Sequence, residues 1–160
     1  MINRRDYSIY NGKIYHVEYI NDYVYLMSKT KDEGFEEFID RDGEIWDGVY
    51  YMKFSNENAP LIYRKKYYAK YAERFLPVKF KKKDDYRLEL DADTDFEFGK
   101  ANDFERYENL FYRKYVSPEE VDELKIEEYL YDKANSKTEK IGETIIPKEN
   151  IREWLDENYQ

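Results

Sequence analysis

The sequence contains no cysteine, only six glycines and four prolines, and no long apolar run. Without cysteine there is no disulfide framework, no thiolate metal site and no cysteine nucleophile. No segment approaches the roughly 20 apolar residues that a membrane-spanning helix needs. The scattered glycines never form GxGxxG or GxxxxGK, which excludes a glycine-rich phosphate loop. We expect a cytoplasmic protein that folds without disulfide bonds or structural metal ions and needs no cofactor.

Catalytic and metal-binding patterns are also scarce. His16 is the only histidine, so the usual zinc site cannot form, and no Ser-His-acid order with a nucleophile elbow is present. Asp91, Asp93 and Asp95 open like a calcium loop. That loop needs glycine at its sixth position and glutamate at its twelfth, where this chain has phenylalanine and asparagine. We therefore expect a structural His16, no metal site and no enzymatic activity.

What the chain does have is charge and tyrosine. Charged residues make up 39% of it, a fraction that by itself favours disorder, but aromatic residues make up 19% and favour a folded core. Nineteen of the aromatics are tyrosines. Tyrosine combines an apolar ring with a polar tip, so it suits the half-buried faces of small sheets and surfaces that bind partners. The composition predicts a folded, mainly β (β-rich α+β) protein.

The net charge of −9 is unevenly distributed. Residues 59–90 hold 10 basic and 4 acidic side chains, whereas residues 1–58 hold 7 and 12, and residues 91–134 hold 6 and 14. The basic belt 63–83 interleaves aromatic rings with cations, a pattern that binds single-stranded nucleic acid by stacking and phosphate contacts. The acidic flanks oppose a polyanion. We therefore rank internal pairing of the belt with acidic strands above nucleic-acid binding.

Alternating polarity dominates the N-terminal half. Two strands flank a tight turn at Asn21-Asp22, and residues 44–54 form either another strand pair or one strand bent at Gly48. The same order of features recurs about 61 residues later: Tyr10 matches Tyr71 and Val17 matches Val78. Two extra residues in the second hairpin then align Tyr23 with Tyr86, and an offset of 61 again aligns Lys53 with Lys114. The self-match predicts two related small β lobes.

Helices are expected only near the C-terminal end. Ser117, Pro118 and Glu120 form the pattern of a short helix start, and Pro147 opens a final helix whose Trp154 face should dock on the second lobe. The expected organisation is an N-terminal β lobe at 1–58, a related lobe at 59–124, and a C-terminal hairpin and helix at 125–160 packed on the second lobe.

The motif order resembles the tandem small-barrel immunity proteins encoded beside polymorphic toxins in Gram-positive bacteria. The residues that carry the resemblance are Tyr10, Gly12, Lys13, Tyr15 and Val17 in the first copy, and Tyr112, Lys114, Tyr115 and Ser117 to Val121 in the second. The second copy departs from the pattern with Glu73 where the first has Gly12. The resemblance implies two SH3-like β-barrel lobes in tandem and a non-enzymatic inhibitor that binds and blocks a toxin domain.

The stretch RLELDADTDFEF, residues 87–98, would place five carboxylates on one face if it were a single strand. The like charges on such a face repel one another and do not stabilise the fold. We therefore expect the face to bind a basic partner; the alternative is that the charges only keep the tyrosine-rich surface soluble. The residues expected to bind a partner are Asp91, Asp93, Asp95, Glu97, Glu105, Glu108, Tyr107 and Tyr112.

Several functions fit an acidic, tyrosine-rich β protein. We expect an immunity-type inhibitor that neutralises a basic toxin domain, and we favour a nuclease toxin because nucleases bind nucleic acid and are often basic. A phage-encoded decoy that mimics DNA and blocks a host nuclease would show the same acidic face. The third alternative is a single-stranded nucleic-acid-binding module that uses the belt 63–83.

Overall fold

The computed structural model of the chain describes residues 6–82, 85–108 and 110–159. The described residues form two compact units. The N-terminal unit comprises residues 6–64 and 128–141, and the C-terminal unit comprises residues 65–127 and 142–159. The strands β6 (Ile62–Tyr71), β11 (Glu123–Asp132) and β12 (Lys137–Pro147) contribute residues to both units. The units are therefore not consecutive stretches of sequence.

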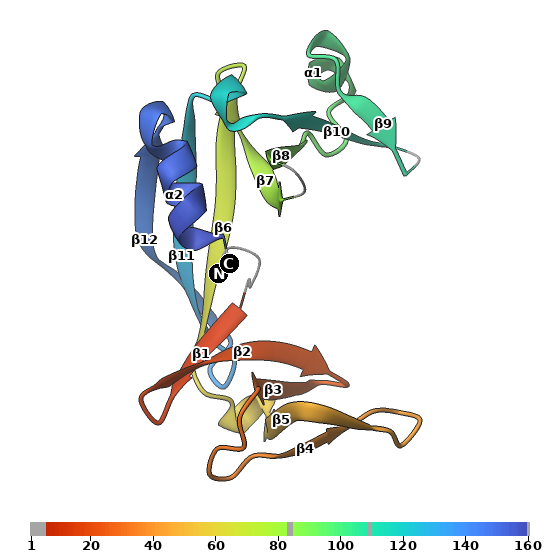
Figure 1. Cartoon of the computed structure of the whole chain (residues 1–160), viewed down its shortest axis with the longest axis vertical. Coiled ribbons are helices and arrows are strands. Elements are labelled where there is room, and N and C mark those ends of the chain that lie inside the picture. Colours follow the sequence, from red (N-terminus) through yellow and green to blue (C-terminus); the bar gives the residue numbers. More distant parts are fainter. Residues whose placement is uncertain (1–5, 83–84, 109, 160) are drawn as a thin grey trace. The chain divides into compact units, whose positions relative to one another are not determined.

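The N-terminal unit is built on antiparallel strands in the order β4-β5-β3-β2-β1, and the first residues of β6 pair with β1 (Figure 1). Its elements are β1 (Asp6–Tyr10), β2 (Lys13–Ile20), β3 (Tyr23–Ser28), β4 (Glu36–Ile39), β5 (Ile45–Ser55) and the 3-10 helix η1 (Asn56–Asn58). Residues 44–54 thus belong mainly to one strand, with Gly48 at φ +72°. The core consists of Tyr15, Val17, Val24, Leu26, Phe35 and Ile62.

The C-terminal unit continues from β6 in the order β6-β7-β8-β10-β9. Its further elements are β7 (Arg74–Lys82), β8 (Tyr86–Asp91), α1 (Phe96–Ala101), β9 (Glu105–Tyr107), β10 (Phe111–Val116), η2 (Pro118–Glu120), η3 (Lys148–Asn150) and α2 (Ile151–Asn158). Ile151 and Leu155 of α2 are buried in the core of this unit, and Trp154 packs against Tyr67 and Phe80. The expected docking of the Trp154 face is therefore confirmed.

The prediction of a mainly β protein with a C-terminal helix is confirmed. The sheet is open rather than closed on itself. At Ser117, the expected helix start forms only the short η2, in which the Ser117 backbone N–H donates to the Glu120 carboxylate at 2.7 Å. Among the described residues, no helix is long and apolar enough to cross a membrane.

The strands of the two units pair in the same order. The hairpin β1–β2 pairs Tyr7 with His16, and the hairpin β6–β7 pairs Tyr68 with Pro77, so both partners are displaced by 61 residues. In the N-terminal unit β3 pairs with β2, and β5 pairs with β3. In the C-terminal unit β8 pairs with β7, and β10 pairs with β8. The last pairing strand is followed by a 3-10 helix in both units.

The register corrects the details of the self-match. Val17 pairs with Leu26 and Val78 with Leu90, so the third strands are displaced by 64 residues, and the second hairpin has three extra residues rather than two. Arg87, not Tyr86, thus takes the place of Tyr23. Met52 pairs with Leu26 and Lys114 pairs with Leu90, so Lys114 corresponds to Met52 rather than to Lys53. The self-match had aligned Tyr23 with Tyr86 and Lys53 with Lys114 because the residues are identical, but the pairing between neighbouring strands determines the correct alignment.

Candidate functional site

The acidic stretch 87–98 is not one strand, so the predicted single face of carboxylates is wrong. The strand β8 ends at Asp91, whose carboxylate accepts a hydrogen bond from the Asp93 backbone N–H at 2.7 Å. Asp93 has φ +53°, and Asp95 is the N-cap of α1, accepting from the Phe98 backbone N–H at 3.0 Å. Short acidic side chains favour turns and helix caps because they hydrogen-bond to nearby backbone N–H groups. That local chemistry ends the strand.

Besides capping α1, Asp95 forms an ion pair with Arg74. Its carboxylate accepts a hydrogen bond from Arg74 Nη1 at 2.8 Å, and the Arg74 guanidinium also lies 4.4 Å from the centre of the Phe98 ring. The hydrogen bond from Arg74, aided by the backbone N–H of Phe98, lowers the pKa of Asp95 below its ordinary value. Asp95 therefore joins α1 to the β6–β7 turn region and contributes little to a repulsive acidic surface.

Three of the other expected acidic residues, Asp91, Glu105 and Glu108, lie close to Tyr107 in the C-terminal unit. Burial raises the pKa of Tyr107, and the charges of Asp91, Glu89 and Glu108 raise it further. We use the name acidic edge for the three expected carboxylates near Tyr107 together with the exposed Asp93, which follows β8, and Glu97 of α1; its members are Asp91, Asp93, Glu97, Glu105 and Glu108. A cation is also present, because the Arg113 guanidinium lies 4.7 Å from the centre of the Tyr107 ring.

Tyr112 does not belong to this surface. Its side chain is only 9% exposed and lies in the core of the C-terminal unit, where its ring meets Phe96 edge to face with 6.0 Å between ring centres. A Cβ at Gly99 would lie 2.8 Å from a Tyr112 ring carbon, so α1 packs directly on this ring. The expectation that Tyr112 contacts a partner is wrong, because residues 112, 114 and 116 form the inward row of β10.

The basic belt pairs with carboxylates of its own chain, as expected. Lys81 lies 2.5 Å from Glu89 and Lys79 lies 3.9 Å from it, while Lys70 lies 3.6 Å from Glu123. Glu89 is only 7% exposed and also accepts a hydrogen bond from the Tyr115 hydroxyl at 2.9 Å. Burial raises the pKa of Glu89, but the bonds from Lys81 and Tyr115 outweigh it and leave the pKa lowered. Lys83 lies outside the described residues.

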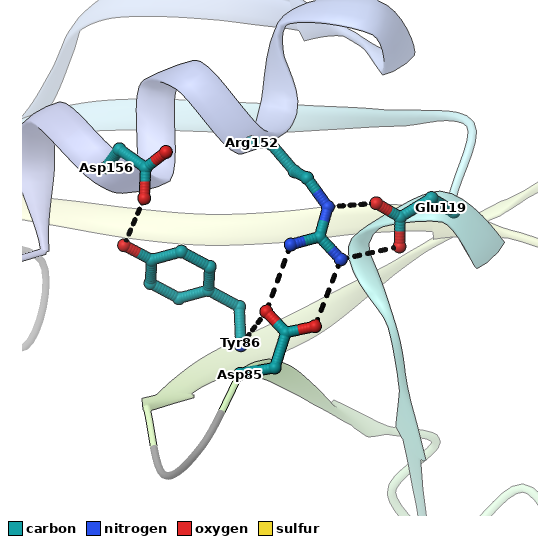
Figure 2. A network of polar contacts seen from close by, with 5 residues as sticks. All are labelled: Asp85, Tyr86, Glu119, Arg152 and Asp156. Atoms are coloured by element: carbon teal, nitrogen blue, oxygen red, sulfur yellow. Dashed lines mark hydrogen bonds and ion pairs between the residues drawn. The ribbon is translucent and has the colours of Figure 1, made fainter.

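A second ion-pair network fixes α2 to the C-terminal unit (Figure 2). Arg152 donates to both oxygens of Asp85, at 3.0 and 3.2 Å, and to both oxygens of Glu119. One turn further along α2, Asp156 accepts a hydrogen bond from the Tyr86 hydroxyl at 2.7 Å. The bonds from Arg152 lower the pKa values of Glu119 and Asp85. These polar groups orient the helix and are satisfied by one another.

The N-terminal unit contains a buried ion pair that sequence reasoning missed. Asp6 is 4% exposed, and Arg64 donates to its two carboxylate oxygens at 2.5 and 2.6 Å. The Tyr19 hydroxyl donates to the same carboxylate at 2.6 Å. Burial raises the pKa of Asp6, but the bonds from Arg64 and Tyr19 outweigh it and leave the pKa lowered. The pair joins β1 to β6, so its role is structural.

The outer face of the same unit carries a row of aromatic rings, also missed at the sequence level. From Trp46 through Phe38 and Tyr51 to Tyr25, neighbouring ring centres lie 5.4 to 5.8 Å apart, and the Lys53 ammonium links Tyr25 to Tyr23 by lying over both rings. We call this row the aromatic ladder; its members are Phe38 of β4, Trp46 and Tyr51 of β5, and Tyr25 and Tyr23 of β3. Val24 and Leu26 alternate with its tyrosines on β3 and are fully buried, so the ladder faces away from the core. That alternation was the signal available in the sequence.

Among the described residues, no group of three or more histidine or acidic side chains is placed to hold a metal ion. The geometry instead supplies two surfaces suited to binding: the acidic edge of the C-terminal unit and the aromatic ladder of the N-terminal unit. His16 lies on β2, where its Nε2 is 2.5 Å from Glu18 Oε1.

A scan of known families matches residues 2–133 to the family described as Uncharacterised conserved protein UCP033725. The chain belongs to this family. No curated protein and no solved structure matches the chain. The part of the UCP033725 chain covered by the family match includes the whole aromatic ladder, the acidic edge and the buried pair of Asp6 with Arg64. The helix α2 lies beyond it.

Proposed function

We propose that this chain is a cytoplasmic, non-enzymatic inhibitor of the immunity type, which binds and neutralises a basic toxin domain through the acidic edge. The observation that carries the proposal is the internal neutralisation of the basic belt. Lys70, Arg74 and Lys81 each lie within ion-pair distance of a carboxylate of this chain. The excess negative charge of the protein therefore remains for the surface, where it attracts cations and repels polyanions.

The acidic edge suits a role in steering a partner. Its side chains at 93, 97, 105 and 108 are exposed, and none of them has an ion-pair partner among the contacts of the described residues. Charges at the rim of an interface act mainly on the rate of encounter and on salt dependence. Tyr107 and Arg113 lie in its midst and supply the amphipathic side chains that interfaces favour.

We further propose that the two units are related copies of one small β lobe of the SH3-like kind. The identical strand order and the identical register of the first hairpins support this relation. A duplicated binding lobe gives one copy the freedom to change its surface while the other keeps the fold. An experimental structure in which the two units superpose on a common SH3-like lobe supports this view, and two unrelated strand paths would refute it.

The test uses the protein encoded beside this gene, produced in an inactivated form. We expect the triple variant Asp93→Asn, Glu105→Gln, Glu108→Gln to lower its association rate about tenfold at low salt, because three steering charges are lost. Asparagine tolerates the left-handed backbone at position 93, so the fold should persist.

The matched control is Glu149→Gln, Glu153→Gln, Glu157→Gln. It removes the same charge from exposed positions on η3 and α2 of the same unit. We expect this control to change the association rate less than about twofold. Equal effects of the two triple variants would show that net charge alone matters and would refute a role for the acidic edge.

A further inference from the structure

The aromatic ladder of the N-terminal unit is an exposed surface that the core does not require. Trp46 is 53% exposed and Tyr23 is 40% exposed. Trp46 is nevertheless held in place, because its indole N–H donates to Asp40 at 3.0 Å. The other oxygen of Asp40 accepts hydrogen bonds from the backbone N–H groups of Asp42 and Glu44 at 2.9 and 3.0 Å. The ring at the end of the ladder is thus presented by a preorganised β4–β5 loop, which lowers the entropic cost of binding.

At three positions of the aromatic ladder, the corresponding face of the C-terminal unit carries charged residues in place of rings. By register, Tyr23 corresponds to Arg87, Tyr25 to Glu89 and Tyr51 to Arg113. In that unit, ion pairs and the Tyr115 hydroxyl satisfy Glu89 at the centre of the face. The same strand arrangement therefore accepts charged residues at these three positions, and the rings of the N-terminal unit need another explanation.

The surroundings of the ladder are strongly acidic. Residues 32–47, which include β4 and the β4–β5 loop, hold eight acidic side chains and one basic side chain, Arg41. Glu36 Oε2 lies 3.5 Å from the Tyr51 hydroxyl. Burial raises the pKa of Tyr51, and the charge of Glu36 raises it further, as expected where negative potential gathers beside the ring.

One cation already occupies the end of the ladder. Lys53 Nζ lies 3.8 Å from the centre of the Tyr23 ring and 6.0 Å from that of Tyr25. A cation over an aromatic face is attracted by the ring quadrupole, and the planar guanidinium of arginine adds stacking to this attraction. The rings of Tyr25, Tyr51 and Phe38 continue the same surface toward Trp46.

We propose that the aromatic ladder docks an arginine-bearing, extended segment of a protein partner, whose guanidinium groups stack on the rings while the carboxylates around β4 neutralise them. Charge complementarity selects this occupant: the acidic surroundings oppose single-stranded nucleic acid, which could otherwise use the rings. The inference rests on the proposed function in one respect, because it assumes that the partner is a basic protein. The ladder is a different surface from the acidic edge.

The test uses intrinsic fluorescence. In the variant Trp154→Phe, Trp46 is the only tryptophan, so its emission reports on the ladder. The probes are a synthetic nine-residue peptide that alternates arginine with serine, its lysine counterpart, and oligothymidylate. We expect saturable binding of the arginine peptide, about fivefold weaker binding of the lysine peptide, and weaker binding of oligothymidylate than of either.

Variants then locate the binding. In the same background, Tyr25→Ala with Tyr51→Ala should weaken arginine-peptide binding by about fivefold or more, whereas Phe96→Ala with Phe111→Ala, exposed rings of the other unit, should leave it unchanged. Glu36→Gln keeps every ring and should weaken binding at low salt only, which provides a second test if the double alanine variant unfolds. Tighter binding of oligothymidylate, or equal binding by the wild-type ladder and the ladder variants, would overturn the inference. If the protein with an intact ladder does not bind the arginine peptide but still forms the complex with the neighbouring gene product, this inference alone is overturned.

Discussion

The β6–β7 turn stores backbone strain that the equivalent β1–β2 turn avoids. In the first turn Asn11 and Gly12 have φ +49° and +74°, and in the second Ala72 and Glu73 have φ +47° and +63°. Two-residue hairpin turns with positive φ at both positions favour Asn-Gly because other residues pay a steric cost there. Identical registers in the two hairpins make the first turn a template for the second.

We predict that Ala72→Asn with Glu73→Gly stabilises the protein by about 1 kcal/mol. Relief of left-handed strain is worth roughly 1–2 kcal/mol at a residue with a Cβ, and the greater flexibility of unfolded glycine offsets about 0.5–1 kcal/mol of it. Asparagine retains part of the strain, which brings the total to about 1 kcal/mol and the rise in Tm to about 3 °C for a chain of this size.

Urea and thermal unfolding followed by circular dichroism measure the effect. The reciprocal variant, Asn11→Ala with Gly12→Glu, installs the second turn in the first hairpin and should destabilise by a similar amount. Unchanged stability in both variants would show that the two turns do not differ in strain, and the reasoning from positive φ would fail.

Two further predictions concern the N-terminal unit. Asp6→Asn should destabilise it by about 2–3 kcal/mol in urea unfolding, because Arg64 then lacks its ionic partner; a loss below about 0.5 kcal/mol would contradict the importance of the pair. Since folding lowers the pKa of Asp6, its contribution is present above pH about 4 and should be lost as pH falls through the lowered value, so the wild-type and Asp6→Asn stabilities should converge at acid pH. His16→Ala should leave binding of the neighbouring gene product unchanged and cost at most a packing penalty, and a loss of binding by a folded variant would reveal a missed site.

Much of the architecture could be predicted from alternation and turn chemistry. The pattern around Asn21-Asp22 predicted β2 and β3, and the final helix expected after Pro147, with its Trp154 face toward the core, corresponds to α2. These signals are local or follow from one buried face. The self-match also indicated the shared order of strands, although the pairing of Leu26 with Val17 and of Leu90 with Val78 was needed to fix its register.

The candidate site was harder to predict because alternation does not reveal where a strand ends. Parity placed Asp91 and Asp95 on one face, but a cap bond to Phe98 and an ion pair with Arg74 put Asp95 at the start of α1. The burial of Tyr112 was obscured because Lys114 shares its row. The aromatic ladder depends on the pairing of β3, β4 and β5, which no local pattern specifies.

The pairing of the basic belt with carboxylates of the same chain, in contrast, could be predicted from the sequence. Opposite charge in neighbouring segments favoured internal pairing, and the structure shows Lys81 beside Glu89 and Lys70 beside Glu123. Long-range electrostatics could be anticipated here because net charge varies on the scale of whole segments. The partners themselves could not, since each pair depends on strand register.

The most direct measurement of the central claim is a calorimetric titration of this chain with the inactivated protein encoded beside its gene, at low and at physiological salt. We predict a saturable complex whose affinity falls as salt rises, because an acidic surface meets a basic one. Binding that strengthens with salt, or no heat of binding at either salt concentration, would contradict the account.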